Sequence, residues 1–119
     1  PLGCAVGCTV LDHVAEPAFL AEVNRKAGLF NQKLAALVDS YPDVFEDLRG
    51  VGLMLGLKCK VPNIQFVEAG YDNQVITVPA GDNVIRLLPP LTITDVEIEE
   101  AVVRLGKAAE CLSAGSSTA

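Results

Sequence analysis

The chain has 119 residues, of which half are hydrophobic and a fifth are charged, and its formal net charge is −6. This composition is typical of one globular domain and excludes a disordered chain. The acidic balance, with no basic cluster larger than Arg25-Lys26, excludes nucleic acid as a partner. No apolar run approaches the roughly 20 residues that span a bilayer, so we expect a cytoplasmic protein that does not bind a membrane.

The first predicted element is a helix over residues 1–16. Its apolar side chains recur every four residues, at Leu2, Val6, Val10 and Val14. This spacing is that of one helix face, and Pro1 suits the first helical position. A chain that opens directly on such a helix is expected to be a piece of something longer.

Two further long helices follow from the same periodicity. The first begins after Pro17, ends before Pro42 and has an apolar stripe at Phe19, Val23, Ala27, Phe30, Leu34, Leu37 and Tyr41. The last begins at a capping box, Thr94-Asp95-Val96-Glu97. Its stripe comprises Ile98, Ala101, Val102, Leu105, Ala108 and Leu112. Residues 17–113 are therefore expected to form one domain, and residues 114–119 a disordered tail.

Between these helices the sequence predicts three strands and a shorter helix. Residues 51–57 alternate apolar side chains with Gly52, Met54 and Gly56, which is the period of a strand. Residues 62–73 read as a helix, and residues 75–78 and 84–88 as an antiparallel hairpin closed by a Gly/Asp/Asn turn. The expected fold is α+β: a small three-stranded, mainly antiparallel sheet with helices packed on one face.

Few side chains could catalyse a reaction. His13 is the only histidine and stands near a helix end, where a packing role is favoured over that of a general base. Lys58 and Lys60 look solvated, and the glycines at 50, 52 and 56 do not have the spacing of a dinucleotide-binding loop. We therefore predict no catalytic residue and no self-sufficient enzyme.

The cysteines do not change this interpretation. Four are present, Cys4, Cys8, Cys59 and Cys111, and their spacing fits no disulfide framework, so we expect free thiols. Cys4 and Cys8 share a helix face, but no second pair completes a metal site, and packed small residues are the favoured reading. No metal is expected.

One guanidinium stands out. Arg86 lies among Val84, Ile85, Leu87 and Leu88, and a charge buried in an apolar strand needs an anion. That anion is a carboxylate of the same chain, of a partner or of a ligand. The strand alone favours a structural ion pair over a ligand.

Two motifs extend the analysis. Residues 49–57, Arg-Gly-Val-Gly-Leu-Met-Leu-Gly-Leu, and residues 77–91, Thr-Val-Pro-Ala-Gly-Asp-Asn-Val-Ile-Arg-Leu-Leu-Pro-Pro-Leu, resemble the C-terminal small domain of class III pyridoxal-phosphate aminotransferases. The opening residues 1–7 and 10–12 are similar to the helix that leads from the large domain of that family into its small domain. The resemblance covers residues 1–112 in the right order and is strongest to the acetylornithine-specific branch.

The resemblance implies a homodimeric enzyme that moves an amino group between N-acetylornithine and 2-oxoglutarate on pyridoxal phosphate, within arginine synthesis. It places Arg86 on the family's carboxylate-gripping arginine, which reverses the preference for a structural ion pair. The role of Arg49 stays open between the family pattern and an ion pair. The cofactor-binding lysine of the family belongs to the large domain and has no counterpart here, so no residue of this chain is expected to bind the cofactor covalently and the chain alone is expected to be inactive.

Three alternatives stay open. The chain could be the small domain of an ornithine, succinylornithine or 4-aminobutyrate aminotransferase. It could be a stand-alone module that binds a small carboxylate through Arg86, in which case the apolar stripe of residues 1–16 packs internally. It could be a structural domain with Arg86 in an internal ion pair.

Overall fold

The computed structural model describes residues 1–117, and the side chains of residues 1–113. The helices are α1 (Leu2–Val14), α2 (Pro17–Ser40), α3 (Asn63–Asp72) and α4 (Asp95–Ser117). The strands are β1 (Phe45–Val51), β2 (Met54–Cys59), β3 (Val78–Ala80) and β4 (Val84–Leu87). The α+β class expected from the sequence is confirmed, as are the order and type of the four helices.

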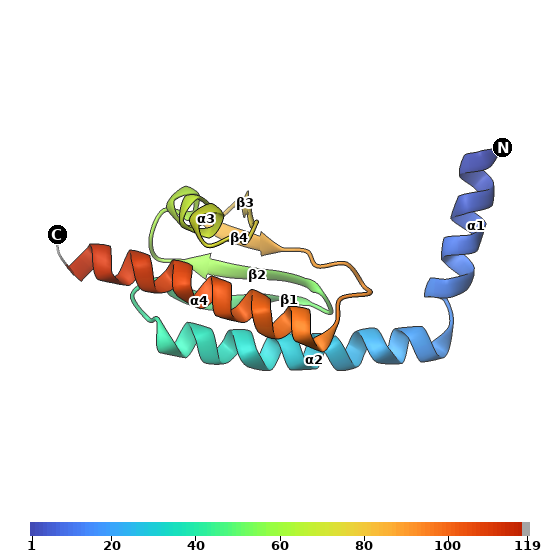
Figure 1. The fold of residues 1–119 in the computed structure, drawn as a ribbon, viewed down its shortest axis with the longest axis horizontal. Coiled ribbons are helices and arrows are strands. Elements are labelled where there is room, and N and C mark those ends of the chain that lie inside the picture. The colour runs from blue at the N-terminus through green and yellow to red at the C-terminus, as the bar shows by residue number, and fades with distance from the viewer. Residues whose placement is uncertain (118–119) are drawn as a thin grey trace.

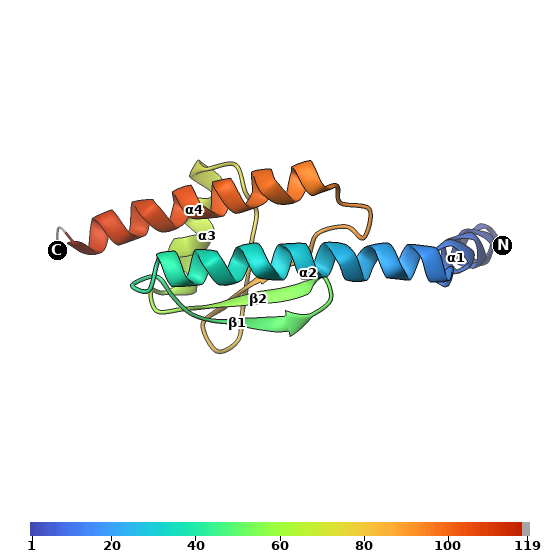
Figure 2. The same cartoon turned by 90° about the horizontal axis from the view of Figure 1, so that it is seen from below.

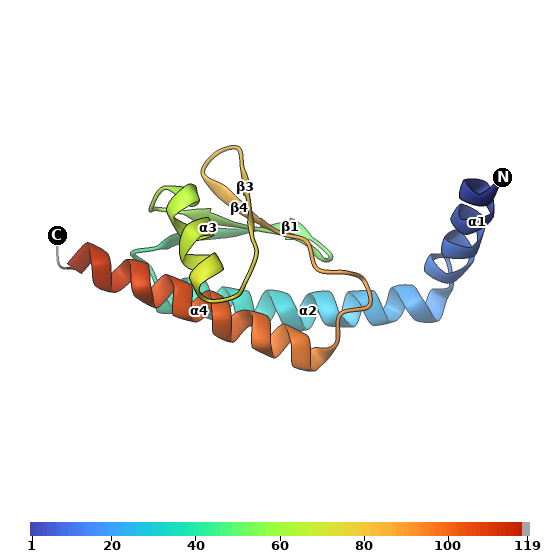
Figure 3. The same cartoon turned by 45° about the horizontal axis from the view of Figure 1, so that its top comes forward.

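The strands form one antiparallel sheet in the order β1-β2-β4-β3. Helices α2, α3 and α4 all lie on the same side of this sheet, as Figure 2 shows, and the arrangement is seen from another angle in Figure 3. No helix of residues 1–117 covers the opposite side, which we call the open face. Helices on one face of the sheet were expected, and this is confirmed.

The core lies between the sheet and the three helices. Helices α2, α3 and α4 and strands β1, β2 and β4 each contribute fully buried side chains to it, among them Leu34, Phe45, Leu55, Leu57, Phe66, Ile85, Ile98 and Leu105. Phe45 and Phe66 pack with ring centroids 5.2 Å apart, a separation typical of favourable aromatic pairs. The expected capping box is also present, since Glu97 N–H donates to Thr94 Oγ1 and Thr94 N–H donates to the Glu97 carboxylate.

Helix α1 stands away from this body (Figure 1). None of its residues is buried, and Leu2, Val6, Val10 and Leu11 are each more than half exposed. The stripe is therefore helical as expected but has no partner within the described chain. No single described helix is long and apolar enough to cross a membrane; α1 and α2 pass that test only jointly, and they are bent by 69° where they meet.

The prediction of three strands was wrong, because the sheet has four. Strand β1 was missed since only Phe45 of its seven residues is buried, and an edge strand with one wet face carries charged residues that hide the apolar alternation. The predicted strand over 51–57 is instead the turn and second arm of a hairpin. Gly52 adopts φ 60° in its two-residue loop, a conformation that glycine adopts without strain.

Two other boundaries differ from expectation. Residues 75–77 lie outside the sheet, and β3 comprises only Val78–Ala80, because Val75 N–H donates to the Gly70 carbonyl and so continues the end of α3. Helix α4 runs to Ser117, inside the segment 114–119 for which disorder was expected, and residues 118–119 lie outside the described part of the chain.

Candidate functional site

The register of the sheet places both motif arginines in one row. Arg49 on β1 pairs with Gly56 on β2, Gly56 pairs with Arg86 on β4, and Arg86 pairs with Val78 on β3. Directly paired residues of antiparallel strands project to the same side of a sheet. Leu55, Leu57, Ile85 and Leu87, which are the chain neighbours of Gly56 and Arg86, are buried in the core. Both arginines therefore lie on the open face.

Arg86 is exposed, which corrects the expectation of a guanidinium buried in an apolar strand. The period of two explains the difference, since the apolar neighbours of Arg86 project to the opposite side of the sheet. Among residues 1–113, no carboxylate lies within ion-pair distance of Arg86. The internal ion pair of the structural alternative is thus absent from the described structure.

Arg49, in contrast, is already engaged. Its Nη1 lies 2.8 Å from Asp82 Oδ2, and its Nε lies 3.6 Å from Asp47. Lys58 Nζ lies 2.6 Å from the other oxygen of Asp82, and only 15 % of its side chain is exposed, so the expectation of a solvated Lys58 was wrong. We call these four side chains the Asp82 network.

The charges of the Asp82 network are mutually stabilising. Hydrogen bonds from Lys58 first and from Arg49 second hold the pKa of Asp82 below its ordinary value, and the bond to Asp82 raises that of Arg49. Asp82 is therefore ionised at every pH near neutrality. Of Arg49, Lys58 and Arg86, only Arg86 has no ion pair within residues 1–113.

The β3–β4 turn that precedes Arg86 is held from both sides. Asp82 and Asn83 adopt φ 60° and 57°, a left-handed conformation that Asp and Asn tolerate better than most residues. Asn83 Oδ1 accepts the backbone N–H of Asn63 at the start of α3, and its Nδ2 donates to the carbonyls of Cys59 and Val61. The N-terminal residue before α3 provides no capping hydrogen bond from its side chain. Asn83 therefore accepts a helix N–H that would otherwise lack a partner, and the same side chain fixes the start of β4.

Asn63 completes this connection by donating from Nδ2 to the carbonyls of Ala80 and Val84. These contacts join the turn to α3 and β2, so the strand that carries Arg86 is fixed three residues before the guanidinium. Sequence reasoning missed Asn63, Asp82 and Asn83 as contributors to the site. The sequence Gly81-Asp82-Asn83 predicts a turn, but it does not predict which distant residues the turn contacts.

Comparison with known proteins supplies the family. Residues 1–109 match the model of the family described as Aminotransferase class-III. The chain belongs to the class III aminotransferases. It is 58 % identical over 113 residues to an acetylornithine aminotransferase of Mesorhizobium japonicum and 53 % identical over 112 residues to one of Rhodobacter capsulatus. These alignments cover 95 % and 94 % of the chain but 28 % of either relative.

Solved structures agree with this assignment. The N-acetylornithine aminotransferase of Stenotrophomonas maltophilia superposes with a TM-score of 0.88 at 29 % identity, over 97 % of this chain and 32 % of that one. The corresponding enzyme of Elizabethkingia anophelis gives 0.83 at 26 % identity, over 92 % of this chain and 30 % of that one. The chain thus spans about a third or less of the aminotransferases that it matches.

The class III family implies pyridoxal phosphate, a cofactor that forms a Schiff base with a lysine. A lysine that forms a Schiff base needs a neutral amine in an apolar setting. Lys58 and Lys33 are instead in ion pairs, with Asp82 and Glu99, and Lys60 and Lys107 are exposed. Lys26 is partly exposed on α2, so none of the five lysines within residues 1–113 is fully buried.

The remaining chemistry-bearing groups lie away from the open face. Cys4, Cys8 and Cys111 are exposed free thiols, so the expectation that Cys4 and Cys8 pack as small core residues was wrong, while Cys59 is buried and free. Burial raises the pKa of the Cys59 thiol to about 11, which leaves it protonated and unreactive. His13 is exposed in the last turn of α1, and no group of residues within 1–113 could hold a metal ion.

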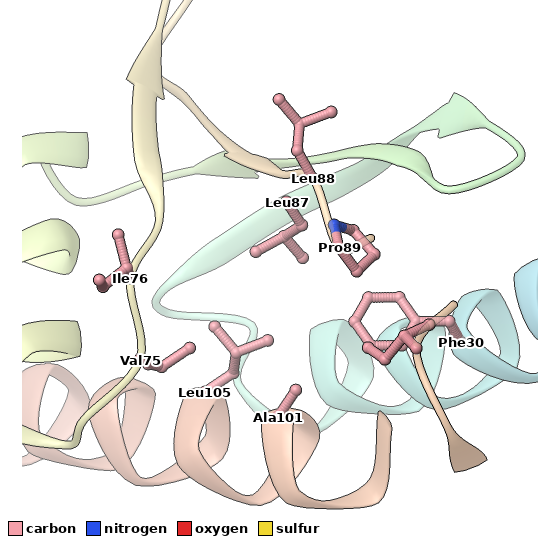
Figure 4. A pocket seen from close by; sticks show the side chains of 9 residues that line it. Phe30, Val75, Ile76, Leu87, Leu88, Pro89, Ala101 and Leu105 are labelled. Carbon is pink, nitrogen blue, oxygen red and sulfur yellow. The ribbon is translucent and has the colours of Figure 1, made fainter. Parts of the chain in front are cut away.

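A cavity of about 130 Å³ lies on the helix side of the sheet. Figure 4 shows its apolar lining, which includes Leu87 of β4, Phe30 of α2 and Leu105 of α4. Arg86 does not line this cavity, since it projects to the other side of β4. The cavity is therefore separate from the open face and offers no polar group to orient a substrate.

Proposed function

We propose that this chain is the small domain of an acetylornithine aminotransferase, in which Arg86 binds a carboxylate of the substrate. The full-length enzyme would move an amino group between N-acetylornithine and 2-oxoglutarate, in arginine synthesis. The observation that carries the proposal is the guanidinium of Arg86 on the open face, which has no ion pair within residues 1–113, whereas Arg49 pairs with Asp82 and Asp47. Identities of 58 % and 53 % to enzymes of that name support the choice of donor.

The physical role of Arg86 follows from its shape. A guanidinium offers two parallel N–H donors that match the two oxygens of a carboxylate. The residue stands on a strand that the sheet and the Asn83 contacts hold in place, so little backbone freedom is lost when a carboxylate binds there. Fixing one end of an amino or oxo acid orients its reacting carbon, which is a large share of what such a site contributes to rate.

The other components would come from outside this chain. Pyridoxal phosphate, when bound to the large domain, supplies the electron sink for amino transfer, and the lysine that carries it is assigned to that domain. Helix α1, with its exposed apolar stripe, would lead from the large domain into residues 17–113 and pack against it. We further propose a cytoplasmic homodimer, by the family resemblance.

The structure weakens one alternative and leaves another open. A stand-alone carboxylate-binding module requires the α1 stripe to pack internally, and none of α1 is buried. A sibling donor, such as ornithine, succinylornithine or 4-aminobutyrate, would leave the role of Arg86 unchanged. The residues that discriminate between donors are expected in the large domain.

The test is a comparison of arginine variants in the full-length enzyme. Arg86→Gln should lower kcat/KM for 2-oxoglutarate by about a hundredfold or more, because a desolvated carboxylate loses its charged partner. Arg86→Lys should give a kcat/KM between those of the wild type and Arg86→Gln, since lysine keeps the positive charge but lacks the two parallel N–H donors of a guanidinium. Arg104→Gln is the matched control, because Arg104 binds Glu100 and the Gln74 carbonyl away from the open face.

Equal losses in the Arg86 and Arg104 variants would contradict the proposed role of Arg86. A wild-type enzyme that transfers no amino group from any of these donors would contradict the proposed function itself. The purified 119-residue chain, assayed with added pyridoxal phosphate, is expected to show no transamination because none of its lysines is placed to bind the cofactor.

A further inference from the structure

We infer that Asp82 is a specificity-determining residue that occupies Arg49 and so leaves Arg86 as the single free carboxylate site on the open face. The inference rests on the proposed function, because it concerns how that site selects its ligand. It assigns a role to Asp82, and through it to Arg49, that is distinct from the binding role of Arg86.

The first step is the position of the two arginines. Arg49 and Arg86 are both direct partners of Gly56, so their backbones stand on either side of β2, about 10 Å apart at the usual strand spacing. Gly56 has no side chain to separate them, and an added Cβ would lie 2.8 Å from Val84 Cγ1. The Val84 side chain therefore covers the buried Gly56 between the two arginines.

The second step is what a free Arg49 would do. Two long cationic side chains on the same face of a sheet can reach over the short Val84 side chain and converge on the two ends of a short dicarboxylate. An acceptor such as 2-oxoglutarate carries two carboxylates, so it could then lie across β2 in an orientation that turns its oxo group away from the reaction. A single free guanidinium permits only end-on binding.

The third step is how Asp82 prevents this. One of its oxygens meets Arg49 Nη1 at 2.8 Å and the other meets Lys58 Nζ at 2.6 Å, so a single carboxylate occupies both neighbouring cations. Asp47 is a weaker partner, at 3.6 Å from Arg49. The position of Asp82 is fixed by the turn that Asn83 ties to Cys59 and Val61, which keeps the carboxylate over Arg49.

The experiment measures inhibition of the full-length enzyme by glutarate, a dicarboxylate with no reacting group, and by butyrate, a monocarboxylate of similar length. Asp82→Asn keeps the size of the side chain and a residue type that tolerates φ 60°. It should lower the inhibition constant of glutarate by about tenfold, the effect of one added charge-assisted contact. The inhibition constant of butyrate should stay within about twofold.

Double variants identify the cation. Adding Arg49→Gln to Asp82→Asn should restore the wild-type inhibition by glutarate, whereas adding Lys58→Gln should not, because the Lys58 side chain is only 15 % exposed and that of Arg49 is 47 % exposed. Glu46→Gln is the matched control, since Glu46 is exposed on the same edge strand and forms no ion pair among residues 1–113. It should leave both inhibition constants unchanged.

Three results would overturn the inference: unchanged glutarate inhibition in Asp82→Asn, an equal change for butyrate, or reversal by Lys58→Gln in place of Arg49→Gln. A purely structural role for Asp82 would lower the melting temperature and weaken all ligands together, without rescue by Arg49→Gln. These outcomes are distinct from failure of the proposed function, which the activity of the wild-type enzyme and of the Arg86 variants decides.

Discussion

At the scale of single residues, the buried hydroxyl of Thr77 lowers the stability of the fold. It is 2 % exposed, and its Oγ1 has no hydrogen-bond partner within residues 1–113. A buried hydroxyl without a partner loses its hydration and regains nothing, and valine has nearly the same shape without that group. Thr77→Val should therefore raise the free energy of unfolding by about 1 kcal/mol. Chemical denaturation of both forms measures this, with the exposed Thr92→Val as a neutral control; a loss of stability at position 77 would contradict it.

Gly50 shows a second residue-scale constraint, imposed by the hairpin rather than by the core. It adopts φ 125°, and a Cβ at this position would collide with the backbone carbonyl of Met54. Gly50→Ala should cost about 2 kcal/mol or more of folding stability, because backbone and not a flexible side chain must move. Gly3→Ala is the control, since nothing lies within 4 Å of its added Cβ. Equal midpoints of thermal unfolding for the two variants would contradict the clash.

At the scale of elements, α2 and α4 are joined by one ionic cluster. Arg25 on α2 donates to Glu22 and reaches Asp95 at the first turn of α4, with Nη2 to Oδ1 at 3.0 Å. The hydrogen bond from Arg25 is the main cause that lowers the pKa of both carboxyls, and Lys26 adds a smaller attraction. A lowered folded-state pKa contributes stability above the unfolded pKa, near 4 for these groups, and loses it as the pH falls through the folded value.

The resulting prediction concerns the acid limb of stability. Arg25→Gln should flatten the decline in the free energy of unfolding between about pH 5 and pH 2, because Glu22 and Asp95 then titrate near their ordinary values. The difference should vanish below both pKa values. Urea unfolding at several pH values measures this, and the exposed Lys107→Gln serves as the control. An unchanged slope in Arg25→Gln would contradict the coupling.

A helix or strand can be predicted from the sequence when one of its faces is buried, because its apolar residues then recur at a regular spacing. Helices α2 and α4 each carry an apolar stripe whose members are buried or half-buried, so their periodicity is readable. Strand β1 buries little beyond Phe45, and its charged residues hide the alternation of apolar and polar side chains that marks a strand. The openness of the face around Arg86 could have been inferred from the alternation with Ile85 and Leu87. The contact between Arg49 and Asp82, 33 positions apart, depends on the strand order β1-β2-β4 and has no local signal.

At the scale of the whole molecule, α1 distinguishes the isolated chain from the full-length enzyme. Cys4 and Cys8 are exposed on α1, Cys111 is exposed on α4 and Cys59 is buried. In the isolated chain, thiol labelling should modify the three exposed cysteines and spare Cys59. If α1 packs against the large domain as proposed, Cys4 and Cys8 should become protected in the full-length enzyme. Mass spectrometry of labelled peptides measures this, and equal rates for Cys4 and Cys8 in both proteins would contradict the proposed packing of α1.

The central claim is that Arg86 binds a substrate carboxylate, and its most direct test compares two amino acceptors in the full-length enzyme. 2-Oxoglutarate has a carboxylate next to its reacting carbonyl, and succinic semialdehyde lacks it. The wild-type enzyme should prefer 2-oxoglutarate, and Arg86→Gln should lower kcat/KM for 2-oxoglutarate by about a hundredfold while leaving the semialdehyde nearly unaffected. An equal loss for both acceptors would show that Arg86 does not bind that carboxylate.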